Sequence, residues 1–133
     1  MRKTNIVRAA AMAAVLAASL LVTPQPAQAS LSQCPAGYFC AWSGGSFTGS
    51  FGYFRCCHPD LRFLGSGGLY NNISSVWDRT GKIWCLFDGL NYTGAYTSLP
   101  KGIKGGVGGF NNRTSSLHVS KDPNNSAGCR PPF

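Results

Sequence analysis

The stretch Cys40-Ala-Trp42-Ser-Gly-Gly-Ser-Phe47-Thr48-Gly49 returns 45 positions later as Cys85-Leu-Phe87-Asp-Gly-Leu-Asn-Tyr92-Thr93-Gly94. A second pair of stretches follows in the same order, Tyr70-Asn71-Asn72-Ile73-Ser74-Ser75-Val76-Trp77 and Asn111-Asn112-Arg113-Thr114-Ser115-Ser116-Leu117-His118, with the Ser-Ser pairs 41 positions apart. A unit this short cannot bury its apolar face alone, so two copies must pack on each other. The repeat therefore predicts one compact domain built from two similar halves.

The first 29 residues read as a secretory signal peptide and not as part of this domain. Arg2, Lys3 and Arg8 precede an apolar run over residues 9–22, and Ala27-Gln28-Ala29 has the small-residue spacing of a cleavage site. The run is shorter than the roughly 20 residues that span a bilayer. We therefore expect a secreted, extracellular protein with no membrane insertion, whose residues 30–133 form a single domain. Its first motif covers about 34–80, its second about 81–120, and 121–133 form an irregular tail.

The expected mature chain is small and moderately basic. The signal removes three of the twelve Lys and Arg, so nine basic residues against four acidic ones leave a net charge of +5. These basic residues are spread along the chain without a run, and dispersed charge of this kind favours solubility. Together with export, this pattern predicts no nucleic-acid partner, and we expect a monomer.

Six cysteines lie in the expected mature chain: Cys34, Cys40, Cys56, Cys57, Cys85 and Cys129. An exported protein folds in an oxidising setting, so this even count predicts up to three disulfides. Cys34 and Cys40 enclose a short loop that one disulfide would close. Neighbouring cysteines rarely bond each other because the linking ring is strained. We therefore expect Cys56 and Cys57 to reach Cys85 and Cys129, in an order that the sequence leaves open.

Strand signals dominate residues 30–133. Glutamate is absent, glycine is abundant, and no window repeats apolar residues at helical spacing. Short alternating runs occupy residues 38–42, 51–55, 73–77, 83–87, 95–99 and 116–120. Glycine-rich turns separate them, among them Gly105-Gly106-Val107-Gly108-Gly109. This spacing predicts an all-β sandwich.

Each copy of the first repeat reads aromatic, four residues, aromatic, one residue, glycine. The residues are Trp42, Phe47 and Gly49 in one copy and Phe87, Tyr92 and Gly94 in the other. A folded hairpin would stack the two aromatic rings and place the glycine at a positive φ that other residues avoid. This pattern resembles the Greek-key motif of the βγ-crystallins.

The wider arrangement is similar to the secreted actinobacterial peptidase-inhibitor family typified by the Streptomyces metalloproteinase inhibitor. The resemblance rests on the Cys34-Pro-Ala-Gly-Tyr-Phe-Cys40 loop before the first motif and on Asn-Asn and Ser-Ser pairs closing each half, and it covers roughly residues 34–120. It implies a βγ-crystallin-like Greek-key sandwich of two motifs, held together by disulfides. It also implies inhibition of an extracellular protease, with a metalloprotease as the expected target.

The residues favour a binding protein over an enzyme. The carboxylates are limited to Asp60, Asp78, Asp88 and Asp122, which lie scattered over loops and strand ends. Glycoside hydrolysis needs two carboxylates that face each other across a cleft, and no nucleophile elbow is present. His58 beside Cys56 and Cys57 is compatible with zinc, but disulfides account better for these thiols. We expect no enzymatic activity and no resident cofactor, apart from the weak calcium site considered next.

The paired Asn and Ser stretches form a candidate calcium site, with Tyr70, Ser74, Asn111, Asn112 and Ser115 as its candidate ligands. Crystallin-type calcium stretches read Asn/Asp, Asn/Asp, two free positions, Ser/Thr, Ser. The second stretch matches this pattern, whereas the first has Tyr70 at its first position. Neither contains a carboxylate, so calcium would bind weakly, toward ~10⁻⁴–10⁻³ M. The alternative is that these side chains satisfy backbone groups in tight turns.

Two segments are candidates for an inhibitory loop. Residues 56–64 carry the cysteine pair and the candidate contact residues Leu61, Arg62, Phe63 and Leu64, whose bulky apolar side chains suit thermolysin-like proteases. Residues 101–107 are glycine-rich and basic, with Ile103 and Lys104 as candidates. A rigid loop has less freedom to lose on binding, which raises affinity. The alternatives are a strand connection with buried Leu and Phe for the first segment and a surface loop for the second.

The sequence thus predicts a secreted inhibitor of an extracellular protease, acting through a rigid, disulfide-braced loop. The alternative is a non-inhibitory crystallin-type module. Such a module would be either a structural protein that binds calcium weakly or an antimicrobial protein similar to killer toxins of this fold.

Overall fold

A computed structural model describes residues 30–64 and 67–133, so the expected signal peptide lies outside the described residues. The described chain forms β1 (Phe39–Gly44), β2 (Thr48–Phe54), β3 (Ser75–Asp78), β4 (Trp84–Phe87), β5 (Tyr96–Leu99), β6 (Lys104–Gly106) and β7 (Ser116–Val119), with short 3₁₀ helices η1 (Leu31–Gln33), η2 (Leu61–Phe63), η3 (Gly108–Phe110) and η4 (Ser126–Cys129). All strand pairings between these elements are antiparallel. The all-β prediction is confirmed. Among the described residues, no helix has the length and apolar character needed to cross a membrane.

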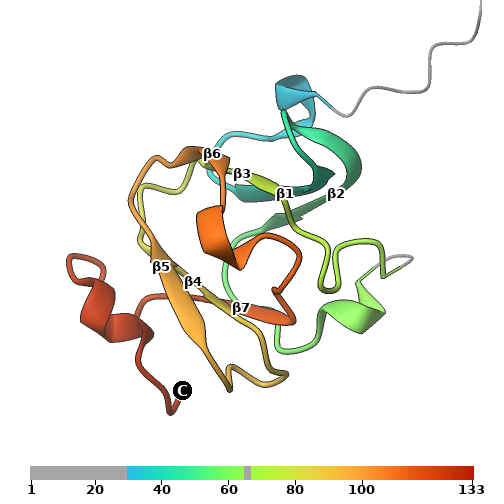
Figure 1. Cartoon of the computed structure of the whole chain (residues 1–133). Helices are drawn as coiled ribbons and strands as arrows, with labels where there is room; N and C mark the ends of the chain where they lie inside the picture. The colour runs from blue at the N-terminus through green and yellow to red at the C-terminus, as the bar shows by residue number, and fades with distance from the viewer. Residues whose placement is uncertain (1–29, 65–66) are drawn as a thin grey trace, which may run out of the picture.

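Each sheet includes or borders a segment from the other half of the chain. The first has the order β2-β1-β3-β6 and lies in the upper part of Figure 1; the second has the order β5-β4-β7 and lies below it. β6 comes from the second half but pairs with β3 of the first. In return, the segment after β2 runs beside β7, where His58 and Leu117 exchange backbone hydrogen bonds of 2.9 and 3.0 Å. Neither half is therefore complete without the other.

β6 was not expected from the sequence, which placed a glycine-rich turn at residues 105–109. Strand pairing uses only main-chain N–H and C=O groups. The edge of β3 therefore recruits Gly105 and Gly106, although these residues lack the alternating side chains that mark a strand. The segment is consequently fixed in the first sheet instead of forming a free surface loop.

Each repeated hairpin is folded over and locked by a serine from the stretch that follows it. Ser75 Oγ donates to the Gly44 carbonyl at 2.7 Å and accepts from the Phe47 N–H at 3.0 Å. Ser116 makes the equivalent pair of hydrogen bonds to Gly89 and Tyr92, at 2.7 and 3.0 Å. The two parts of the repeat therefore depend on each other.

Gly94 shows why the last position of the repeat is glycine. Its φ is +81°, and that of the equivalent Gly49 is +83°. A Cβ at Gly94 would collide with the Asp88 carboxylate, which accepts a hydrogen bond from Ala95 N–H at 2.8 Å. Both the backbone conformation and the available space therefore exclude a side chain there. The aromatic rings of each pair meet as expected, but edge to face instead of stacked, at 5.3 Å for Trp42–Phe47 and 5.9 Å for Phe87–Tyr92.

The main core lies between the sheets, and a smaller apolar cluster covers the outer face of each. The completely buried aliphatic and aromatic residues of the main core are Phe39, Ala41, Leu61, Ile73, Val76, Trp84, Leu86 and Leu117. Outside the first sheet, the Cys34–Cys40 disulfide lies with Trp42; outside the second, Cys85–Cys129 lies with Phe87. Each cluster thus joins a terminal segment to its sheet.

The disulfides confirm one expectation and correct another. Cys34 and Cys40 are bonded, as predicted. Cys85 bonds Cys129, and Cys56 bonds Cys57. The reason is the position of β7, which lies between β4 and the segment that carries Cys56 and Cys57. Two strand spacings amount to about 10 Å, beyond the roughly 7 Å between Cα atoms that a disulfide can bridge, so this pair cannot reach Cys85.

Candidate functional site

The η2 turn displays one large apolar side chain between two residues that hold it in place. Phe63 is 79% exposed, more than any other large apolar side chain in the described part of the chain. In the same turn Leu61 is completely buried in the main core, and Leu64 packs against that core. The two leucines fix the turn while the Phe63 ring faces solvent.

Polar contacts brace this turn further. The Asp60 carboxylate accepts a hydrogen bond from the Arg62 N–H at 3.0 Å and forms an ion pair with its guanidinium at 2.7 Å. The guanidinium lies 5.4 Å from the centroid of the Phe63 ring. The Leu61 N–H donates to the Ser115 carbonyl at 3.0 Å, which ties the turn to the second half. The Arg62 side-chain hydrogen bond lowers the pKa of Asp60 below its ordinary value, so the ion pair persists into acidic solution.

A pocket of about 420 Å³ opens beside the turn, and Leu64 forms part of its wall. Phe51 and Tyr53 of β2 and Leu69 line it as well. Tyr53 is 54% exposed, and β2 is an edge strand of its sheet. Phe63 directly precedes Leu64 of the pocket wall, and exposed apolar surface is a common feature of protein-binding sites.

The second candidate segment presents a different surface. Ile103 packs against the main core, and Lys104 lies in β6 with its ammonium 4.7 Å from the centroid of the Trp77 ring. The Gly102 N–H donates to the Asp78 carboxylate at 2.8 Å. The segment therefore exposes charge and backbone, while Ile103 and Val107, its two bulky apolar side chains, pack with the core.

The calcium candidates lie where the two halves cross. Ser74 Oγ donates to Asn112 Oδ1 at 3.1 Å, and Ser115 Oγ donates to Asn71 Oδ1 at 2.7 Å. Asn71 was not singled out from the sequence, although it stands 41 positions before Asn112 and the repeat could have identified it. Tyr70 and Asn111, the remaining two candidates, flank these contacts in the sequence. The oxygens gathered here are neutral amides and hydroxyls, which are weak ligands for calcium.

Three of the four aspartates act in local structure away from η2. Asp78 accepts hydrogen bonds from the Thr80 and Gly102 N–H groups, both at 2.8 Å. Asp88 pairs with Arg113 at 3.0 Å, and Asp122 accepts from the Asn124 N–H at 3.0 Å. Together with the Asp60 cap, these contacts give each of the four carboxylates a partner in local structure.

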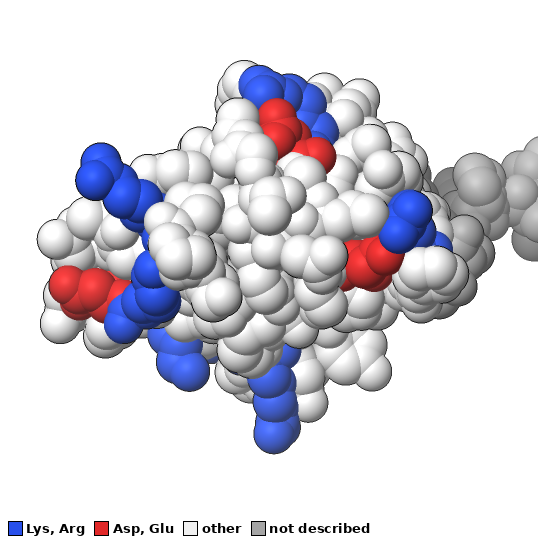
Figure 2. Space-filling model, turned by 90° about the horizontal axis from the view of Figure 1, so that it is seen from below, with Lys and Arg blue, Asp and Glu red and all other residues white. Residues whose placement is uncertain are grey.

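Positive charge is dispersed on the surface. On the face drawn in Figure 2 the Lys and Arg side chains occupy separate places, several of them next to an Asp. Others lie over the protein's own aromatic rings: Arg55 is 4.7 Å from the centroid of Tyr38, and Arg79 is 4.7 Å from that of Trp77. On the face that Figure 2 draws, the charge does not form the continuous stripe typical of nucleic-acid binding.

Solved structures with a similar fold include βγ-crystallin domains. A beta gamma crystallin from Ciona intestinalis aligns with a TM-score of 0.54 at 21% identity, covering 62% of this chain and 99% of that one. The N-terminal domain of protein S aligns with a TM-score of 0.52 at 21% identity, covering 65% and 98%. A βγ-crystallin domain from Flavobacterium johnsoniae aligns with a TM-score of 0.52 at 26% identity, covering 61% and 91%. These likenesses establish the βγ-crystallin fold predicted from the repeat.

No curated protein sequence matches this chain significantly. The sequence model of peptidase inhibitor family I36 matches residues 27–99. That match includes the first repeat, the cysteine pair, the η2 turn and strands β4 and β5. Because the match covers more than half of the sequence, the chain belongs to peptidase inhibitor family I36.

Proposed function

We propose that this protein is a secreted, non-enzymatic inhibitor of an extracellular metalloprotease, and that it binds its target as a monomer through residues 60–64. Family membership supports a protease as the partner. The observation that carries the choice of surface is the exposed Phe63 ring, held between Leu61 and Leu64. The expected signal peptide supports secretion.

The energetics favour a side chain that is already in place before binding. Burying a phenylalanine side chain contributes roughly 1.5–3 kcal/mol, and this gain is reduced when the loop that carries it must be ordered. The buried Leu61 and the ion pair between Asp60 and Arg62 have ordered this turn in the free protein. Phe63 therefore needs little rearrangement to enter an apolar pocket of a thermolysin-like protease.

The backbone of the turn supports insertion of a side chain over strand pairing. Residues 61–63 form a 3₁₀ helix, in which the Leu64 N–H donates to the Leu61 carbonyl at 3.3 Å. A peptide that pairs with another strand must be extended so that its main-chain groups are free. The turn thus fills a pocket without offering an extended peptide for cleavage.

A titration tests the proposal. Purified residues 30–133 with their disulfides intact are added to thermolysin and, separately, to the serine protease subtilisin, and residual hydrolysis of a small peptide substrate is followed. We expect stoichiometric loss of thermolysin activity and no effect on subtilisin. Inhibition of subtilisin alone would contradict the metalloprotease assignment, and no inhibition of either enzyme at large excess would contradict inhibition of these protease classes.

A second candidate function is a structural module with weak calcium binding. The observation that favours it is the pair of contacts Ser74–Asn112 and Asn71–Ser115, which gather four polar side chains from both halves. This function requires calcium to stabilise the fold. Thermal unfolding, measured once with calcium and once with a chelator, distinguishes this function from inhibition.

A further inference from the structure

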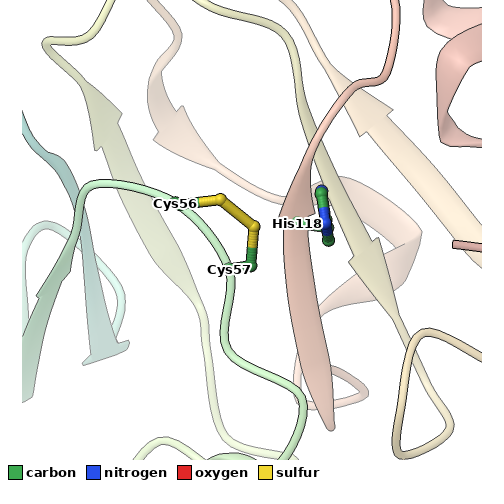
Figure 3. A group of neighbouring side chains, drawn as sticks. All are labelled: Cys56, Cys57 and His118. Carbon is green, nitrogen blue, oxygen red and sulfur yellow. A yellow bond between two sulfur atoms is a disulfide. The ribbon is translucent and has the colours of Figure 1, made fainter.

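Two cysteines and a histidine gather outside the proposed inhibitory turn. The Sγ atoms of Cys56 and Cys57 and a ring nitrogen of His118 lie within 4.8 Å of one another. The cysteines form a disulfide on the segment that runs beside β7, and His118 belongs to β7 itself, as Figure 3 shows. This arrangement depends on the fold, because His118 lies 61 positions after Cys57.

The Cys56–Cys57 disulfide is the accessible one. Cys56 is exposed and Cys57 is half-buried, whereas the cysteines of the other two disulfides are all buried. Thiol–disulfide exchange depends on access to the sulfur, so mild reduction should open this bond first. The bond joins neighbouring residues, so the loop that it closes contains no other residue. Since a disulfide stabilises a fold mainly through the loop it closes, the protein should remain folded without it.

His118 is arranged as a ligand. Its Nδ1 lies within hydrogen-bond distance of the Val119 carbonyl, and because a carbonyl can only accept, Nδ1 carries the proton. In the neutral ring, Nε2 then keeps its lone pair. The ring is packed at 4.8 Å from the centroid of Tyr92 and 4.2 Å from that of Phe133. Metal-binding histidines commonly donate their other N–H to a backbone carbonyl in this manner, which fixes the tautomer.

We propose that reduction of Cys56–Cys57 creates a binding site for a zinc-class cation, held by two thiolates and Nε2 of His118. A dithiol supplies two electrons and two protons, so that the S–S bond becomes two thiols and the dithiol becomes a cyclic disulfide. Binding of Zn²⁺ then releases the two thiol protons to solvent. Two sulfurs and one imidazole are a donor set that suits zinc, with water in the fourth position.

The spacing of the group fits this role after a small adjustment. Zinc lies about 2.3 Å from thiolate sulfur and about 2.0–2.1 Å from imidazole nitrogen, so neighbouring ligands of a tetrahedral ion are roughly 3.5–4 Å apart. The three donor atoms lie within 4.8 Å of one another, so the His118 ring and the sulfurs need to approach by no more than about 1 Å. Opening the disulfide also allows the two sulfurs to separate to the distance that a shared ion requires. Rotation of the cysteine side chains supplies both movements.

The test uses the mature chain in two redox states. The oxidised protein is treated with a limited amount of a water-soluble phosphine, which takes oxygen from water as it reduces the disulfide and is then removed under nitrogen. Mass mapping with a thiol-alkylating reagent locates the free thiols. Zn²⁺ is titrated in competition with a chromophoric chelator, and Co²⁺ is used separately to detect thiolate-to-metal charge transfer. We expect one zinc ion per reduced chain, a charge-transfer band with Co²⁺, and neither in the oxidised chain.

Two variants separate this site from adventitious binding. His118→Phe keeps an aromatic ring against Tyr92 and Phe133 but removes the nitrogen, and we expect its reduced form to bind zinc at least tenfold more weakly. A double variant, Cys56→Ser with Cys57→Ser, should bind none. The proposal is overturned if the reduced, folded wild type binds no zinc, if His118→Phe binds as tightly as the wild type, or if reduction opens a buried disulfide before Cys56–Cys57. These outcomes are independent of protease inhibition.

Discussion

Leu61 and Phe63 lie two residues apart in one turn, yet Leu61 is completely buried and Phe63 is 79% exposed. The sequence alone presents both as bulky apolar residues of one candidate loop. The structure separates their roles, because the backbone of η2 directs Leu61 into the core and Phe63 away from it. Stability and binding should therefore respond to different substitutions within the same turn.

The first prediction concerns this division. Leu61→Ala removes a fully buried side chain and leaves a cavity, so it should lower the free energy of unfolding by about 2–5 kcal/mol. Phe63→Ala removes an exposed side chain and should change it by less than about 0.5 kcal/mol. Urea unfolding of both variants measures the difference. Equal destabilisation would show that Phe63 also supports the core.

The second prediction is the pH dependence of the cap. The Arg62 hydrogen bond lowers the pKa of Asp60 below 3.8, its ordinary value. A carboxylate with a depressed pKa stabilises the fold above its ordinary pKa, and this contribution disappears as the pH falls through the lower, folded-state value. The cap should therefore remain formed near pH 4 and be lost only in more acidic solution. NMR titration of the Asp60 carboxyl carbon should show the depressed pKa, and Arg62→Met should return it toward the ordinary value. An unshifted pKa in the wild type would contradict the bracing role.

The third prediction compares the two buried disulfides. Cys85–Cys129 spans 44 positions and Cys34–Cys40 spans 6. Because of loop-closure entropy, the Cys85–Cys129 disulfide should contribute ~2 kcal/mol more to the free energy of unfolding than Cys34–Cys40. Replacing each pair by alanines and measuring urea unfolding tests this difference, since both replacements leave apolar side chains in buried positions. If replacing Cys34 and Cys40 lowers the free energy of unfolding more than replacing Cys85 and Cys129, then packing around η1 matters more than chain entropy.

The fourth prediction concerns calcium. A site with a Kd of ~10⁻⁴–10⁻³ M would add about 1.4–2.7 kcal/mol to stability at roughly 10 mM calcium. We expect no such gain over a chelator, because the oxygens of the Ser74–Asn112 and Ser115–Asn71 pairs are neutral amides and hydroxyls, and calcium affinity rises with ligand charge. Asn71→Ala and Asn112→Ala should instead each lower the free energy of unfolding by about 1 kcal/mol, the usual contribution of a hydrogen bond. A clear rise in the unfolding midpoint with calcium would assign the second candidate function.

The repeat predicted the fold because its residues act locally. Gly49 and Gly94 take the positive φ that the pattern requires, and the paired aromatic residues meet within their own hairpins. The Cys34–Cys40 disulfide could be predicted for the same reason, because it closes a short loop between residues that are near each other in the sequence. These features depend on neighbours in the sequence, so the sequence contains enough information to place them.

Features set by contacts between the halves were harder to predict. β6 forms because the edge of β3 pairs with main-chain groups, and glycines carry no side-chain pattern to reveal it. The Cys56–Cys57 bond follows from the position of β7, which no local rule gives. Likewise, only the packing of η2 against the core distinguishes Phe63 from Leu61. The repeat alone could have identified Asn71, through its equivalence to Asn112.

The most direct test of the central claim is the inhibition constant for thermolysin of the wild type, Phe63→Ala and Tyr96→Ala. Tyr96 is a matched control because it is an exposed aromatic residue, 38% accessible, in β5 and therefore outside the η2 turn. We predict that Phe63→Ala weakens inhibition at least tenfold, about 1.4 kcal/mol, while Tyr96→Ala inhibits like the wild type. Equal inhibition by the wild type and Phe63→Ala would contradict the account.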